Sequence, residues 1–265
     1  MGHVGRVLVL ALMLALAGCG GRSRMGDDVV SISSTTATVS GPSRFGDLDP
    51  VEWQGGGPHG FPVHGIDVSK YQGVIDWNRV RQAGVEFAYI KATEGGDHAD
   101  ERFLLNWVGA RQAGVRRGAY HYFYFCRPAA EQARWFIDHV PRDSLALPHV
   151  LDMEWNHRSR TCPFRPDGAT VRREAKIYLD ILERHYGRRP VIYTTVDFYR
   201  DTDIGRVGST EFWLRSVAGH PRDVYPGQAW RFWQYTGTGV VDGIAGPVDI
   251  NVFAGSGGQW ALWAQ

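Results

Sequence analysis

The chain has 265 residues, of which 43% are apolar and 22% are charged, so it is long enough to fold around one large core or two small ones. Its 29 lysines and arginines nearly balance its 28 aspartates and glutamates, which leaves a formal net charge of +1. This balance excludes a strong overall field for polyanions, and we expect no nucleic-acid partner.

The first element in chain order is an apolar run that follows Arg6. Residues 7–17 (VLVLALMLALA) have the length of a signal-peptide core and are too short to cross a bilayer, so residues 1–18 are predicted to be a signal peptide. The run ends in Leu-Ala-Gly-Cys19, which resembles the lipobox of bacterial lipoproteins, where the cysteine becomes the lipidated first residue. We therefore expect a lipoprotein of the bacterial cell envelope that faces the periplasm or the cell wall and meets the membrane only through Cys19. The alternative is an ordinary cleaved signal with an incidental cysteine.

Residues 19–60 contain few large apolar side chains and include the runs SISSTTATVS and WQGGGPHG. Such a composition is typical of a flexible tether. We place the start of the folded domain near Phe61, so that residues 61–265 form one domain.

Strand-like and helix-like segments alternate within residues 61–265. The pentapeptide RQAGV occurs at residues 81–85 and again at 111–115, a spacing of 30 residues that suits one strand plus one helix. Each copy ends a helical pattern, and further helices are predicted over 129–140 and 169–186. Strands are predicted over 65–69, 87–93, 118–125, 148–154, 190–195, 212–217, 230–235 and 247–253.

This alternation predicts an α/β fold with a parallel sheet, most simply closed into a TIM-like (β/α) barrel. Glycine and proline in residues 218–228 and 236–246 leave no room for full helices there. We therefore expect an irregular barrel with incomplete helices in its last third.

Four acidic residues stand near the ends of predicted strands. Asp152 and Glu154 are two positions apart on one strand, so both side chains project from the same face. Asp67 and Asp249 each lie between apolar residues in the same manner. If the strands are parallel, these acids gather at the C-terminal rim of the barrel, where such folds carry their active sites. The alternative for each acid alone is a helix cap or an arginine partner.

Other chemistries find little support in the sequence. The 10 histidines form no grouping with metal-ligand spacing, the glycine-rich segments do not match a phosphate-binding loop, and no serine lies in a Gly-x-Ser-x-Gly motif. We therefore expect neither a metal nor a cofactor. Paired carboxyl groups beside aromatic rings are instead what a glycoside hydrolase needs, because one acid protonates the leaving oxygen while another supports the developing positive charge.

Several segments of the sequence together resemble a known family. The segments GIDVS with YQG, YIKATEG, GAYHY, the Asp152-x-Glu154 pair, WQY and VDIN stand in the order found in glycoside hydrolase family 25, over about residues 63–253. The members of that family are N-acetylmuramidases (Chalaropsis-type lysozymes) with an irregular barrel. The resemblance implies a peptidoglycan hydrolase, expected to be monomeric, that cleaves the β-1,4 bond between N-acetylmuramic acid and N-acetylglucosamine in glycan strands.

The resemblance also implies roles for single residues. Glu154 matches the general acid, and Asp152 matches the partner that positions the acetamido group of the substrate or stabilises the charged intermediate. The remaining candidates for substrate binding are Asp67, Asp249, Tyr122, Tyr193 and Trp233. Core packing is the alternative for the three aromatic residues. Acetamido participation with retention and direct inversion both stay open, and the alternative functions are a non-catalytic wall-binding lipoprotein and a glycosidase on other N-acetylated glycans.

Two cysteines remain once Cys19 is set aside. Cys126 follows the strand predicted to end at Phe125, and Cys162 lies on the segment that leaves the Asp152/Glu154 strand. Consecutive strands of a barrel would deliver both cysteines to the same rim, so we predict a disulfide in an oxidising compartment. Two separately buried thiols are the alternative.

Overall fold

A computed structural model describes residues 45–53, 56–156 and 159–265 of the chain. The predicted signal peptide, the lipidation site Cys19 and most of the predicted tether lie outside the described residues. Within them, the helices are all too short or too polar to cross a membrane.

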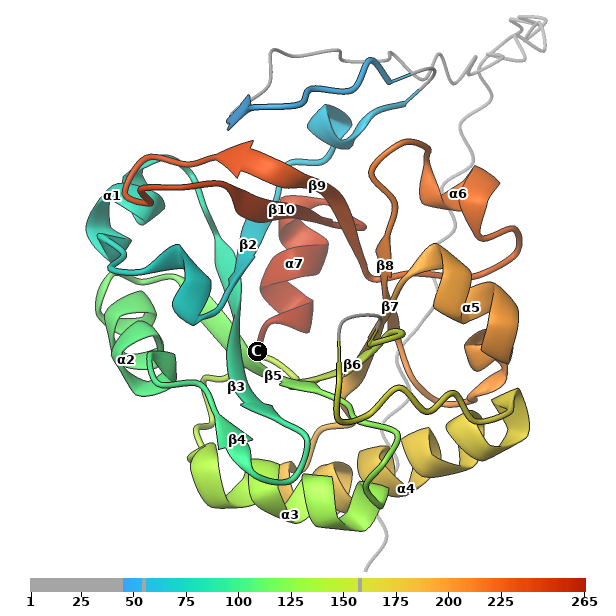
Figure 1. Ribbon diagram of the computed structural model, residues 1–265. Helices are drawn as coiled ribbons and strands as arrows, with labels where there is room; N and C mark the ends of the chain where they lie inside the picture. Colours follow the sequence, from blue (N-terminus) through green and yellow to red (C-terminus); the bar gives the residue numbers. More distant parts are fainter. Residues whose placement is uncertain (1–44, 54–55, 157–158) are drawn as a thin grey trace, which may run out of the picture. The chain divides into compact units, whose positions relative to one another are not determined.

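Eight strands close into a barrel, as predicted (Figure 1). Each strand pairs with the next, and the last pairing in the circle, between β8 and β9, closes the ring. In order around the barrel the strands are β2 (His64–Val68), β3 (Phe87–Glu94), β5 (Arg116–Tyr122), β6 (Val150–Met153), β7 (Val191–Thr194), β8 (Phe212–Arg215), β9 (Phe232–Val240) and β10 (Val248–Phe253).

One strand corrects the expectation of an all-parallel barrel. Strands β2 to β9 are parallel around the ring, but β10 runs antiparallel to both of its neighbours, β9 and β2. Only residues 241–247 join β9 to β10. This connection is too short for the crossover that parallel strands need, so the two strands form a hairpin.

The helices follow the predicted pattern in the first two thirds of the chain. The described helices are α1 (Trp77–Gln82), α2 (Phe103–Gln112), α3 (Ala129–His139), α4 (Gly168–Tyr186), α5 (Val196–Thr202), α6 (Pro221–Val224) and α7 (Gly257–Trp263). Both RQAGV copies end a helix, and the glycine after each helix, Gly84 or Gly114, has a positive φ that favours this residue. Short 3-10 helices lie at Pro58–Gly60, Lys70–Gln72 and Ile204–Arg206.

The last third is irregular, as predicted, although it holds more structure than expected. Helix α6 has only four residues, and β9 continues to Val240 where no regular element was predicted. Helices α5 and α7 were not predicted, because each has only seven residues and too few turns to show a clear helical period. The irregularity therefore reflects short helices and a long hairpin.

Aromatic side chains fill one end of the barrel. Phe87, at the start of β3, and Phe253, at the end of β10, both contact Trp260 of α7 with ring centroids 5.2 Å apart. Tyr89 and Trp213 stack above them at 5.0 Å, and all these rings are buried. Helix α7 thus closes the end at which the parallel strands begin, which leaves the opposite end for a site.

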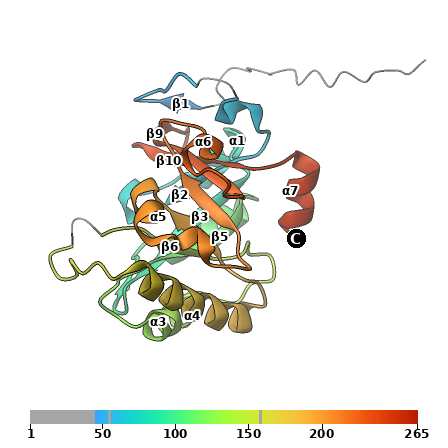
Figure 2. The same ribbon diagram turned by 90° about the vertical axis from the view of Figure 1, so that its right-hand side faces the viewer.

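The packed part of the chain begins earlier than the predicted start near Phe61. Strand β1 (Gly46–Asp47) pairs antiparallel with the end of β9 and lies above the β9–β10 hairpin (Figures 1 and 2). Phe45 is buried, and Trp53 packs edge-to-face on Trp233 at 5.0 Å. A few large rings hold residues 45–53 although their average composition resembles a tether, so these residues pack on the domain that was predicted to start near Phe61.

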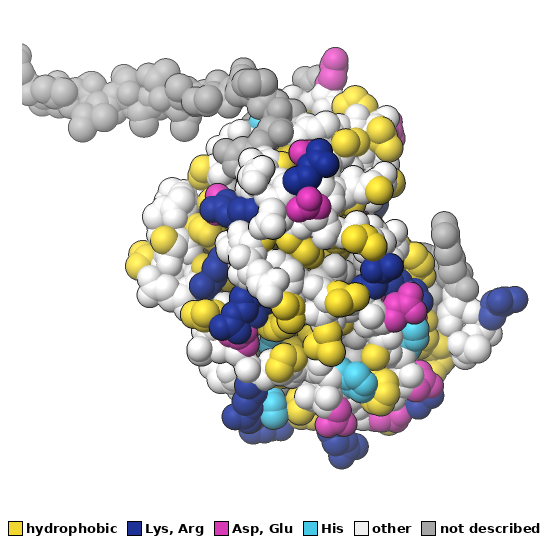
Figure 3. Space-filling model, turned by 90° about the vertical axis from the view of Figure 1, so that its left-hand side faces the viewer, with side chains coloured by type: hydrophobic (Ala, Val, Ile, Leu, Met, Phe, Trp, Pro, Cys, Tyr) yellow, Lys and Arg dark blue, Asp and Glu magenta, His cyan; other side chains and the backbone are white. Residues whose placement is uncertain are grey.

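The surface agrees with the balanced composition. On the face shown in Figure 3, basic and acidic side chains are interspersed, and neither sign forms a block. Among the described residues, surface charges form pairs such as Arg79 with Asp242 and Lys176 with Asp180. This face therefore offers no field for a polyanion.

Candidate active site

A cavity of about 320 Å³ lies at the open end of the barrel and is lined by all four predicted acids. Asp67 comes from β2, Asp152 from β6 and Glu154 from the residue that follows β6. Asp249 also reaches this rim, but from the beginning of the antiparallel strand β10, where it lies opposite Asp67. The acids meet as predicted, although the route of Asp249 differs.

Strand alternation places the Asp152 and Glu154 side chains in the cavity. Leu151, just before Asp152, and Met153, between the two acids, are fully buried in the core that the strands share with the surrounding helices. Burying these two apolar side chains on one face leaves the acids on the other. The Oδ1 atom of Asp152 is buried and has no hydrogen-bond partner among the described residues, so it is an acceptor available to a ligand.

Two amide side chains hold Asp67. Its Oδ2 accepts hydrogen bonds from Nε2 of Gln234 and from Nδ2 of Asn251, both at 2.8 Å. The amide oxygens accept in turn, Gln234 from the Tyr193 hydroxyl at 2.9 Å and Asn251 from Nε1 of Trp213 at 2.7 Å. This network fixes both amides with their donors toward Asp67 and favours its charged form.

Burial dominates the acid–base properties of the acids. It raises the pKa of Glu154 to about 7 and the pKa of Asp67 to about 6. Burial also raises the pKa values of Asp152 and Asp249 well above the usual range, and the neighbouring acids Glu154 and Asp67 respectively raise them further. Glu154 is therefore protonated in a large fraction of molecules near neutral pH.

Two cations oppose this effect, and the sequence reasoning missed both. Arg215 at the end of β8 lowers the pKa values of Glu154, Asp67 and Asp249, while Lys91 of β3 lowers those of Asp152 and Glu154. Lys91 lies in the quoted YIKATEG segment. Arg215 is two positions after Trp213, so the strand period was the signal that could have placed it in the cavity.

Lys91 is held by neighbours at the rim. Its Nζ is 2.6 Å from Oε2 of Glu94 and 4.9 Å from the ring centroid of Tyr122. The Tyr124 hydroxyl donates a hydrogen bond to Oε1 of Glu94. The cation is thus fixed between a carboxylate of its own strand β3 and a ring of the neighbouring strand β5.

The predicted aromatic contacts divide into two groups. Tyr122 and Tyr193 line the cavity as predicted. Trp233 does not: it is fully buried on the outer face of β9, where it donates a hydrogen bond from Nε1 to the Ser216 carbonyl at 2.8 Å. The prediction for Trp233 is wrong because Gln234 takes the inward position. Tyr71, which was not singled out, lines the mouth with 81% of its surface exposed.

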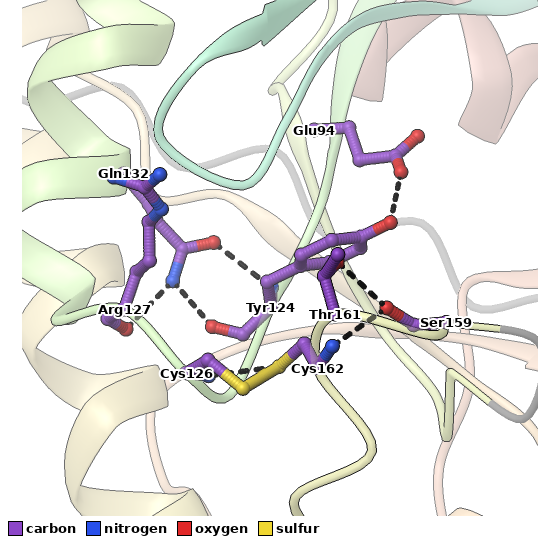
Figure 4. The surroundings of a disulfide bond; sticks show 8 residues. All are labelled: Glu94, Tyr124, Cys126, Arg127, Gln132, Ser159, Thr161 and Cys162. Carbon is purple, nitrogen blue, oxygen red and sulfur yellow. Dashed lines mark hydrogen bonds between the residues drawn. A yellow bond between two sulfur atoms is a disulfide. The ribbon is translucent and has the colours of Figure 1, made fainter.

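The predicted disulfide between Cys126 and Cys162 is confirmed (Figure 4). The Cα atoms are 5.7 Å apart, and the Cys162 amide donates to Oγ of Ser159 at 2.9 Å. Tyr124, the partner of Glu94, is two residues before Cys126, and Figure 4 shows these groups together. The bond therefore ties the loop that leaves the Asp152/Glu154 strand to the loop that follows β5.

A metal site does not emerge from the part of the chain that the structure describes. Among those residues, no group of three or more histidine, cysteine, aspartate or glutamate side chains is arranged to hold an ion. The chemistry that the cavity offers is instead proton transfer and charge stabilisation by carboxyl groups beside sugar-sized space.

Comparisons with known proteins agree with this chemistry. A model of the glycosyl hydrolases family 25 matches residues 66–244. The chain is 39% identical over 204 residues to the uncharacterized protein YegX of Escherichia coli (strain K12), which covers 75% of this chain and 72% of the relative. It is also 39% identical over 208 residues to lysozyme M1 of Streptomyces globisporus, with 73% and 68% covered. A solved bacterial lysozyme from Streptomyces coelicolor superposes with a TM-score of 0.68 at 36% identity, covering 76% of this chain and 96% of that one.

Proposed function

This chain belongs to glycosyl hydrolase family 25, and we propose that Glu154 and Asp152 perform its peptidoglycan hydrolysis at the open end of the barrel. The enzyme is a lysozyme-type glycoside hydrolase. The observation that carries the residue assignment is the cavity itself, in which burial raises the pKa of Glu154 to about 7. A carboxyl group that keeps its proton near neutral pH is suited to general acid catalysis.

In the proposed reaction, Glu154 donates its proton to the glycosidic oxygen between N-acetylmuramic acid and N-acetylglucosamine as the C–O bond breaks. The acetamido oxygen of the muramic acid attacks the anomeric carbon and forms a cyclic intermediate. Water then opens this ring and gives its proton to the Glu154 carboxylate. The acid returns to its starting state, and the bond is hydrolysed with retention.

Asp152 supports the charged intermediate in this scheme. Its buried, unpartnered Oδ1 suits an acceptor for the acetamido N–H of the substrate. Burial raises the pKa of the Asp152 carboxyl. A substrate N–H that donates a hydrogen bond to it favours the ionised form, and the carboxylate then offsets positive charge on the acetamido group. An inverted anomer as the first product, detected by NMR, would contradict acetamido participation.

Asp67 and Asp249 bind the sugar in the proposed site, with Tyr122 and Tyr193 as further contacts. Because Asp67 is held by two amide donors, its carboxylate presents a fixed acceptor to sugar hydroxyls. The exposed ring of Tyr71 offers a flat apolar surface at the mouth, a role that the sequence assigned to Trp233.

The variant Glu154→Gln tests the assignment. It keeps the shape of the side chain but removes the transferable proton, so we expect turnover of purified peptidoglycan to fall by about 100- to 10,000-fold. Glu101→Gln, at an exposed position outside the cavity, is the control and should keep full activity. Mass spectrometry of the released fragments identifies the bond that is cut. A near-normal rate for Glu154→Gln would remove this residue from the role of acid.

We further propose that the enzyme is a monomeric lipoprotein of the cell envelope, anchored only through Cys19. The support is the lipobox-like segment that ends at Cys19, together with the disulfide, which suits an oxidising compartment. Cys19→Ser should move the protein from the membrane fraction to the soluble fraction. Unchanged membrane association would overturn the proposal.

A further inference from the structure

A second cavity, of about 370 Å³, lies beside the catalytic one. Its lining includes Asp47, Asp49, Val51 and Trp53 from the N-terminal segment, here called the N-terminal wall. Other lining residues are Val217, two residues after β8, and Tyr235 of β9. The volume resembles that of the catalytic cavity, so the two spaces suit ligands of similar size.

The two cavities adjoin. Arg215 lines both of them. Gly237, which lines the second cavity, lies so close to Asp249 of the first that a Cβ atom on this glycine would be 3.2 Å from Oδ1 of Asp249. Arg215 and the close approach of Gly237 to Asp249 therefore mark the place where the two cavities meet.

The N-terminal wall lies outside the residues that the family model matches, which begin at residue 66. Several contacts hold it in place. Strand β1 pairs with β9, Oδ1 of Asp47 accepts a hydrogen bond from the Thr238 hydroxyl at 2.6 Å, and Trp53 packs on Trp233. The wall is thus built before any ligand arrives, which lowers the ordering cost of binding.

The lining suits a neutral sugar. Trp53 and Val51 offer aromatic and aliphatic surface suited to the C–H faces of a pyranose ring, and the exposed Asp49 carboxylate can accept hydrogen bonds from its hydroxyls. The lining sets two carboxylates, Asp47 and Asp49, against one arginine, Arg215, so it offers no excess positive charge to an anionic stem peptide. The charges and the shape together favour the glycan over the peptide.

We propose that the second cavity is a further glycan subsite, which binds a neutral sugar of the same strand beyond the units held in the catalytic cavity. The inference rests on the proposed function, because it takes peptidoglycan glycan as the substrate. It assigns to the N-terminal segment the task of extending the substrate groove.

The test uses the full chain and peptide-free peptidoglycan strands with even lengths from two to eight sugars. Asp49→Ala and Val51→Ser alter exposed side chains of the wall and leave the catalytic groups unchanged. Glu52→Ala, in the same segment but outside the cavity lining, is the matched control. We expect Asp49→Ala and Val51→Ser to lower kcat/KM on eight-sugar strands roughly 3- to 10-fold, as for the loss of one contact of ordinary strength. The shortest strand that is cleaved should show no loss.

Other outcomes overturn the inference. An equal loss at every length, or none at any length, would rule out a distal sugar subsite. A loss seen only when stem peptides are present would assign the cavity to the peptide. If the unaltered enzyme cleaves none of the strands and no intact peptidoglycan, the proposed function fails, whereas cleavage without a length effect rejects only the subsite.

Discussion

Removing the positive charge of Arg215 should move the alkaline limb of the pH–activity profile to higher pH. The pKa of Glu154 is about 7, and Arg215 is the strongest influence that opposes its elevation by burial. Arg215→Gln removes a charge that favours the ionised carboxylate, so Glu154 should keep its proton to higher pH. Asp67 acts on Glu154 in the opposite sense, but its influence is smaller than that of Arg215.

The expected size follows from the titration of one group. With a pKa of about 7, Glu154 is protonated in about nine tenths of molecules at pH 6 and about one tenth at pH 8, so kcat/KM falls about tenfold on this limb. In Arg215→Gln the fall between these two pH values should be smaller. The absolute rate should also drop, because Arg215 lines the cavity, so the shape of the profile is the quantity to compare.

The assay is the initial rate of peptidoglycan solubilisation at low substrate concentration, from pH 4.5 to 9, which reports the free enzyme. Arg206→Gln is the matched control, since the Arg206 side chain is 75% exposed and does not line the cavity. This control should keep the unaltered profile. An alkaline limb that stays in place or moves to lower pH in Arg215→Gln would refute either the role of Glu154 as the acid or the influence of Arg215 on it.

Three further predictions follow from the same structure. Asp152→Asn should lower kcat at least about 100-fold at an unchanged melting temperature, because a neutral amide cannot offset positive charge; a loss below tenfold in single-turnover rates would contradict this role. Replacing Cys126 and Cys162 by serine opens a loop with a sequence separation of 36 and should cost about 4 kcal/mol in urea unfolding, whereas a cost under about 1 kcal/mol would show that loop closure contributes little. Burial lowers the pKa of His121 to about 4, so its contribution to stability is complete above pH 6.5 and is lost as the pH falls toward 4, by about 2 to 3 kcal/mol at pH 4.5. His121→Gln should reduce this acid sensitivity in thermal melts, and an equal sensitivity in both proteins would count against it.

Local patterns were sufficient to predict the barrel and the meeting of the acids. Two-residue alternation decides which side of a strand faces the cavity, and this rule placed Asp152 and Glu154 correctly. The same rule, applied to β9, places Gln234 inward and Trp233 outward. Trp233 was predicted to contact sugar because it is a large aromatic residue, without regard to its position on the strand.

Features that depend on distant partners were beyond local patterns. The reversal of β10 follows from the short connection between β9 and β10. The prediction ended β9 at Tyr235, whereas the strand continues to Val240, so the connection looked longer than it is. The packing of residues 45–53 depends on a few rings that find neighbours on β9, and average composition does not reveal such contacts. Arg215 and Lys91 matter because of the charges around them, which only the folded barrel brings near.

The hydrogen bonds that hold Asp67 also make the site depend on the completed barrel. Their donors, Gln234 and Asn251, are 167 and 184 residues further along the chain and belong to the last two strands of the barrel. Contacts between residues so far apart in sequence require a long loop to close, and the entropy cost of that closure precedes the stabilisation that the contacts provide. A barrel without β10 would lack both Asp249 and the strand that joins β9 to β2. The site is therefore complete only when the last two strands of the barrel are in place.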